Sequence, residues 1–170
     1  MFFKKLFSQY HEICDKDVTP INQDGLSEAK KVKGNLVISA DDNYHTGVGF
    51  NFRADKLHTV KGNLVLHPKV SFRCNNLETV GQKIFAYDVD FLDMPNLKQA
   101  ICVYADNINC INLPNLQNST IYLTADFIPS TLIYHPSTTI KYEKSPLLTR
   151  EIIKKALESY ANSRRISRGR

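Results

Sequence analysis

Short stretches in which apolar residues recur at every second position run along the middle of the chain, and this pattern is typical of β-strands that bury one face. Residues 35–38 (NLVI) and residues 63–66 (NLVL) are two such stretches, and others follow toward residue 142. The expected inward positions are Leu36 and Ile38, Leu64 and Leu66, Ile84 and Ala86, Ile101 and Val103, Ile121 and Leu123, and Ile140 and Tyr142. The pattern therefore predicts a series of strands that share one core.

These stretches belong to an internal repeat. Residues 32–39 (VKGNLVIS) return as residues 60–67 (VKGNLVLH), and residues 101–106 match residues 121–126. The motif LDMPNL, which ends at Leu97, likewise matches INLPNL, which ends at Leu116. A period of about 20 residues is too short for a pair of helices but suits one strand and a return segment. We therefore expect a mainly β solenoid of stacked parallel coils.

Asparagine recurs at one place in the return segments. The dipeptide Asn-Leu closes three of them, at residues 76–77, 96–97 and 115–116. The side-chain amide of Asn can hydrogen-bond backbone groups at a turn. Repetition of this residue predicts a ladder of such bonds along the stack of coils.

In these motifs the chain resembles the leucine-rich repeat superfamily, in particular bacterial and phage repeats that read L-x-x-V-x-G-N-L-x-L, and more distantly the receptor L domain. The resemblance covers residues 26–127. Two coils keep V-K-G-N-L, whereas residues 81–84 (GQKI) lack the Asn and the coil at Leu97 lacks the Gly. The resemblance implies a curved surface of parallel strands used for binding, with no catalytic residue. It also implies a bacterial or phage origin and a role as an effector or inhibitor.

The two ends of the chain are expected to cap this solenoid, which occupies residues 26–143. Apolar residues at helical spacing in residues 2–14 predict an amphipathic helix within an N-terminal cap of residues 1–25. Pro146 begins a second helical pattern within residues 144–162, and residues 163–170 form a basic tail. The apolar stripe of this C-terminal helix consists of Leu147, Leu148, Ile152, Ala156, Leu157 and Tyr160.

Composition and charge narrow the class of protein. The chain has 170 residues, of which 42% are hydrophobic and 23% charged, as expected for one soluble domain. The net charge of +5 is concentrated in the tail, at Arg164, Arg165, Arg168 and Arg170. The four Cys form no C-x-x-C pair and the five His are scattered, so neither a metal nor a cofactor is expected. The N-terminal residues lack the apolar run of a signal peptide, which favours a cytoplasmic protein with free thiols.

The outward face of the strands carries the candidate site. Val37, Val65, Phe85, Cys102 and Tyr122 are expected to lie side by side on this face. A hydrophobic, aromatic and charge-poor patch of this kind is typical of protein interfaces. The candidate partner-binding residues are Val65, His67, Phe85, Tyr87, Tyr104 and Tyr122. The alternative is that the C-terminal segment folds across the sheet and buries this patch.

The sequence thus predicts a non-enzymatic protein-binding module, located in the cytoplasm or delivered into a host cytosol. No nucleophile, phosphate-loop or zinc-protease motif is present. A competing hypothesis is nucleic-acid binding by the four Arg of the tail, which could contact phosphates without sequence preference. A third hypothesis is an enzyme whose site is assembled from the insertion at residues 41–49.

Overall fold

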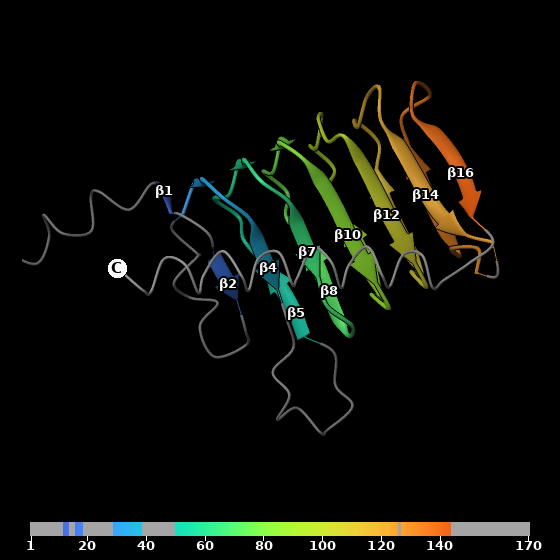
Figure 1. The fold of residues 1–170 in the computed structure, drawn as a ribbon, viewed down its shortest axis with the longest axis horizontal. Coiled ribbons are helices and arrows are strands. Elements are labelled where there is room, and N and C mark those ends of the chain that lie inside the picture. The colour runs from blue at the N-terminus through green and yellow to red at the C-terminus, as the bar shows by residue number, and fades with distance from the viewer. Residues whose placement is uncertain (1–11, 14–15, 19–28, 39–49, 126, 144–170) are drawn as a thin grey trace, which may run out of the picture.

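The computed structural model describes residues 12–13, 16–18, 29–38, 50–125 and 127–143. In this part of the chain every strand pairs in parallel with the equivalent strand of a neighbouring coil, and no helix is present. Successive coils stack side by side to form a β-solenoid (Figure 1). The fold class predicted from the 20-residue repeat is confirmed.

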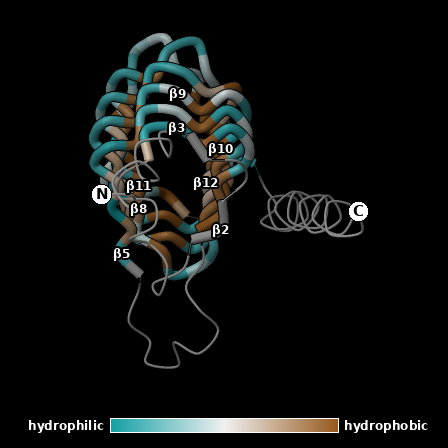
Figure 2. Tube along the Cα trace, turned by 90° about the vertical axis from the view of Figure 1, so that its left-hand side faces the viewer, coloured by the Kyte–Doolittle hydropathy of each residue, from teal (hydrophilic) through white to brown (hydrophobic). Residues whose placement is uncertain are grey.

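Three parallel sheets form the sides of the solenoid. The seven-stranded sheet contains β2 (Lys16–Val18), β4 (Leu36–Ile38), β7 (Leu64–Leu66), β10 (Lys83–Tyr87), β12 (Cys102–Asp106), β14 (Thr120–Thr124) and β16 (Thr139–Glu143). The five-stranded sheet contains β5 (Phe50–Arg53), β8 (Val70–Arg73), β11 (Phe91–Asp93), β13 (Cys110–Leu113) and β15 (Thr131–Tyr134). The four-stranded sheet contains β1 (Glu12–Ile13), β3 (Lys31–Val32), β6 (Thr59–Val60) and β9 (Thr79–Val80). A view along the stack shows the labelled strands of the seven- and five-stranded sheets on opposite sides (Figure 2).

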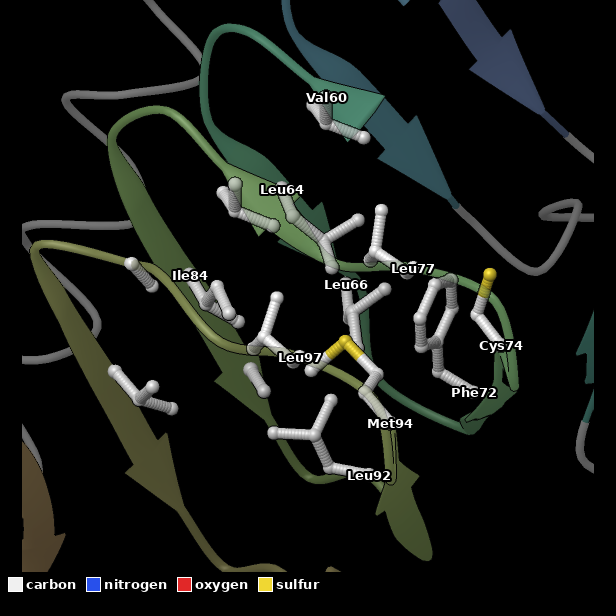
Figure 3. Close-up of a cluster of buried hydrophobic side chains, with 14 of the residues drawn as sticks. Val60, Leu64, Leu66, Phe72, Cys74, Leu77, Ile84, Leu92, Met94 and Leu97 are labelled. Carbon is white, nitrogen blue, oxygen red and sulfur yellow. The ribbon is translucent and has the colours of Figure 1, made fainter. Parts of the chain in front are cut away.

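The core lies between these sheets and is built from rows of equivalent side chains. One row joins Leu36, Leu64 and Ile84 and continues through Val103 and Ile121, all of them fully buried. Leu and Met side chains of successive coils meet inside the solenoid (Figure 3). Because each row repeats an aliphatic residue at the strand spacing, every coil covers the apolar surface of its neighbour.

Two ladders of Asn side chains connect the turns. Asn96 and Asn115 donate from Nδ2 to the backbone carbonyl oxygens of Asn75 and Pro95, both at 2.7 Å. Asn76 makes the equivalent bond to the carbonyl of Asp55, so the predicted ladder is confirmed. A second ladder comes from the V-K-G-N-L motif, shared by residues 32–36 and 60–64. In it Asn63 N–H donates to Asn35 Oδ1 at 2.8 Å, and Lys83 N–H donates to Asn63 Oδ1 at 3.1 Å.

The N-terminal boundary differs from the expectation. Residues 12–13 were expected to end a helix, but Glu12–Ile13 form β1, which pairs with β3. Residues 16–18 form β2, which pairs with β4, so coil structure begins inside the range assigned to the cap. Short strands at the edge of an existing sheet gain backbone hydrogen bonds, and this gain outweighs a helical pattern in the sequence. The rest of the N-terminal cap, the C-terminal helix and the basic tail lie outside the described residues.

The position of Ile101 differs from the predicted core. Its side chain is 60% exposed, and it lies in the turn before β12. The sequence match of residues 101–106 to residues 121–126 places Ile101 beside Ile121, but in the sheet it is Val103 that pairs with Ile121. A shift of two residues keeps every side chain on its face and moves it along the strand. Ile101 therefore falls beyond the strand end.

The last described coil is less buried than those before it. Ile140 continues the inner row and pairs with Ile121, but it is only partly buried, and Tyr142 is 54% exposed. On the five-stranded side Ile133 and Tyr134 of β15 are 46% and 42% exposed. β15 and β16 are the edge strands of their sheets, so no further coil covers them within the described residues.

Candidate functional site

The outward face of the seven-stranded sheet carries one continuous row of side chains, which we call the outer row. The strand register places its six members on adjacent strands: Val37, Val65, Phe85, Tyr104, Tyr122 and Lys141. The Phe85 and Tyr104 rings stack with centroids 5.4 Å apart and planes 5° apart. Tyr104 and Tyr122 stack at 4.9 Å and 12°. Since parallel strands repeat at about 4.8 Å, in-register rings are brought into stacking distance by the fold itself.

Cys102 does not belong to this row. It pairs with Lys83 and Thr120, two residues from Tyr104 along β12. The prediction that Cys102 lies beside Phe85 and Tyr122 is therefore wrong. Tyr104 occupies that position, because β12 is shifted by two residues from the register that the sequence match suggested, as it is at Ile101. Burial raises the pKa of the Cys102 thiol, which therefore stays protonated near neutral pH.

Burial divides the outer row into two halves. Val37, Val65 and Phe85 are 6%, 3% and 3% exposed and form a second apolar cluster, separate from the core inside the solenoid. Tyr104 packs against this cluster but is only partly buried, and Tyr122 is also partly exposed. The tyrosine end of the row is therefore partly accessible to solvent, whereas Val65 and Phe85 are buried.

Two lysines flank the tyrosines. Lys83 Nζ lies 5.8 Å from the centroid of the Tyr104 ring, and Lys141 Nζ lies 5.7 Å from that of Tyr122. Both distances allow attraction between the cation and the ring face. Desolvation by burial raises the pKa of Tyr104 to about 12, with smaller contributions from Cys102, Tyr122 and Glu143. The Tyr104 hydroxyl is therefore a neutral hydrogen-bonding group at physiological pH.

A polar group lies beside the outer row at the carboxyl ends of the strands. Asp106 is the last residue of β12 and pairs with Tyr87 of β10. Its Oδ1 accepts a hydrogen bond from Thr124 Oγ1. Asp106 and Thr124 are only 3% and 5% exposed. Asp106 Oδ2 and Glu143 Oε2 are buried and have no hydrogen-bond partner among the described residues.

The structure thus brings most of the predicted site residues together. Phe85, Tyr104 and Tyr122 share one row, and Tyr87 packs against the same cluster. His67 directly follows β7 and is partly buried. The prediction missed Lys83 and Lys141, although counting in steps of two along the strands already placed Lys83 on the outward face. The four tail Arg and the insertion at residues 41–49 lie outside the described residues.

Comparisons with known proteins add no relative, since no protein-family model, curated protein or solved structure matches the chain. Among the described residues there is no group of three or more His, Cys, Asp or Glu that could hold a metal ion. The same residues include no helix with the length and hydropathy needed to span a bilayer. The outer row and its flanking residues are therefore the candidate site on the geometry alone.

Proposed function

We propose that this protein is a non-enzymatic protein-binding module whose partner contacts the tyrosine end of the outer row. The observation that supports this proposal is the stack of Phe85, Tyr104 and Tyr122 on a sheet face directed away from the solenoid core. A solenoid needs no aromatic residues on that face, because its core is complete without them. Aromatic anchors with rigid, amphipathic rings are the residues that contribute most to protein interfaces.

The chemistry around the stack indicates the kind of partner surface that suits it. The partly exposed Tyr104 and Tyr122 rings offer apolar contact area and two hydroxyl groups, and stacking on their neighbours restrains both rings. Lys83 and Lys141 add positive charge on either side of the rings. The best complement is a protein surface with an apolar centre and carboxylates at its rim.

The resemblance to bacterial and phage leucine-rich repeats supports the same function. It suggests that the partner belongs to a larger machine on which this protein acts as an effector or inhibitor, in a cytoplasmic or host-cytosolic setting. Nucleic-acid binding by the Arg-rich tail is the competing proposal, and it involves none of the outer-row residues.

The test is affinity capture from the native source with the wild-type chain, Tyr104→Ala and Tyr122→Ala, with and without nuclease, read by mass spectrometry. We expect a protein that the wild type retains under nuclease and both variants lose. Tyr134→Ala is the matched control, because it removes a 42% exposed Tyr from the five-stranded sheet. Melting temperatures of all four proteins must accompany the capture. If the Tyr variants retain every partner, or if all capture disappears with nuclease, the proposal is wrong.

A further inference from the structure

Two carboxylate oxygens on the outward face of the seven-stranded sheet are buried without a hydrogen-bond partner among the described residues. They are Oδ2 of Asp106, a residue that is only 3% exposed, and Oε2 of Glu143. Removing a charged carboxylate from water is costly unless a donor or a positive charge compensates for the lost hydration. The two oxygens therefore point to a positively charged ligand beside them.

The two carboxylates lie at the carboxyl ends of neighbouring strands. Asp106 ends β12, Thr124 ends β14 and Glu143 ends β16 (Figure 1). The strand register pairs Thr124 with Glu143, and Thr124 Oγ1 donates a hydrogen bond to Asp106 Oδ1. Thr124 therefore lies between the two acidic residues, about 4.8 Å from each along the direction of the sheet.

The side chains of both acidic residues are directed toward this middle strand. The hydrogen bond from Thr124 holds the Asp106 carboxylate on the β14 side of β12. Glu143 lies two strands from Tyr104, yet its charge is among the contributions that raise the pKa of Tyr104. This influence fits a Glu143 side chain that extends over β14 toward β12. The two carboxylates thus share the space beside Thr124.

The described residues do not supply the compensating charge. The ion pairs among them join other carboxylates to Lys or Arg, at Arg53–Asp55, Arg73–Asp93 and Lys98–Glu78. Lys83 and Lys141 of the outward face lie over the rings of Tyr104 and Tyr122 instead. A proton shared between the two unpartnered oxygens would create a hydrogen bond between them, and they form none.

From this geometry we infer that Asp106, Thr124 and Glu143 bind a hard divalent cation, with Ca²⁺ as the best match. Two carboxylates balance the charge of one divalent ion, and the group offers oxygen atoms alone, which calcium prefers. Calcium also accepts irregular arrangements of oxygen ligands, whereas Mg²⁺ requires a nearly ideal octahedron. Both unpartnered oxygens are closed to solvent, and an ion needs less room there than a Lys or Arg side chain from a partner.

The separation of these residues along the chain explains why no sequence motif marks the site. Asp106, Thr124 and Glu143 are 18 and 19 residues apart and come from three successive coils. Only stacking of the coils brings them together. The inference is independent of the proposed function, because it concerns an ion and not the protein partner.

Terbium luminescence tests the site directly, because Tb³⁺ binds at calcium sites and emits when a nearby tyrosine is excited. The chain has no Trp, and Tyr122 is two residues from Thr124, so tyrosine is the sensitiser. Full-length wild type, Asp106→Asn and Glu143→Gln are stripped of metal with a chelator, titrated with Tb³⁺ and then with competing Ca²⁺. The matched control is Glu78→Gln, which removes an exposed carboxylate that pairs with Lys98. Melting temperatures are measured with and without CaCl₂.

We expect sensitised emission that Ca²⁺ displaces in the wild type and in Glu78→Gln, and at least about tenfold weaker Tb³⁺ binding in Asp106→Asn and Glu143→Gln. Ca²⁺ in about 100-fold excess over its dissociation constant should raise the wild-type Tm by about 5 °C or more. It should leave the Tm of both site variants unchanged. Without Ca²⁺ these variants should melt at or above the wild type, because each has lost a buried, uncompensated charge.

A wild type that shows neither sensitised emission nor a rise in Tm with Ca²⁺ would overturn the inference. Binding that persists unchanged in Asp106→Asn and Glu143→Gln would also overturn it, because the ion would then lie elsewhere. Far-ultraviolet circular dichroism verifies that each variant is folded. If Asp106→Asn does not fold, Glu143→Gln decides the outcome alone, since Glu143 ends the edge strand β16 and is not fully buried.

Discussion

Two residues expected to be equivalent core positions, Leu64 and Ile101, should differ sharply when truncated. Leu64 is fully buried and in register with Leu36 and Ile84 on either side, so Leu64→Ala leaves a cavity between three coils. Substitutions of this kind cost about 2–5 kcal/mol, and the enclosed position of Leu64 favours about 3 kcal/mol. Ile101 is 60% exposed, so Ile101→Ala should change the free energy of unfolding by less than about 0.5 kcal/mol.

Urea denaturation followed by circular dichroism measures both effects on one scale. For a chain of this length about 3 kcal/mol corresponds to a decrease in Tm of roughly 6–12 °C, whereas the Ile101 variant should melt with the wild type. Equal losses in the two variants would refute the reasoning, because they would place Ile101 in the core and remove the two-residue shift between β12 and β14.

Three further outcomes follow from single features. In Gly81→Ala the new Cβ would clash with the backbone carbonyl oxygen of Lys61, so the free energy of unfolding measured by urea denaturation should fall by at least about 2 kcal/mol. Burial raises the pKa of Cys74 to about 12 from 9.0; the stabilisation that this provides is complete below pH 9 and is lost as pH rises toward 12. Cys74→Ala should therefore show a smaller decrease in urea midpoint between about pH 8 and about pH 10.5 than the wild type. Deletion of residues 164–170 should leave Tm unchanged and abolish any salt-dependent binding to nucleic acid, which filter binding measures; nucleic-acid binding that survives the deletion would exclude the tail as its source.

The sequence was sufficient to predict the solenoid because its repeat encodes both the strand and the turn of each coil. Leu64 lies one strand from its equivalent Leu36, as the shared V-K-G-N-L motif predicts. The register of later coils was less predictable, since similarity between residues 101–106 and 121–126 suggested an offset of 20, and the strands pair at 18. A shift of two residues leaves each side chain on the same face of the sheet, so the two faces of β12 were assigned correctly, whereas Ile101 and Cys102 were placed beside the wrong residues.

The candidate site was predictable as a set of residues but not as a surface. Tyr104 and Tyr122 follow from counting outward positions, and stacking follows once their strands are adjacent. The exposure of Tyr104 and Tyr122 depends on which other parts of the protein pack against the outward face of the sheet. The alternation of residues within a strand does not reveal such packing. The burial of Val65 and Phe85 could be found only from the folded chain.

The paired positions also show where this fold tolerates changes in length. From Leu36 through Leu64, Ile84, Val103, Ile121 and Ile140, consecutive members of the inner row are 28, 20, 19, 18 and 19 residues apart, yet all six pair in one continuous sheet. The differences in coil length are therefore accommodated in the turns between the sheets, while each coil advances the stack by one strand spacing of about 4.8 Å. Duplication of one coil would therefore lengthen the sheet by one fixed strand spacing. Insertions at a corner would add loops without changing that spacing.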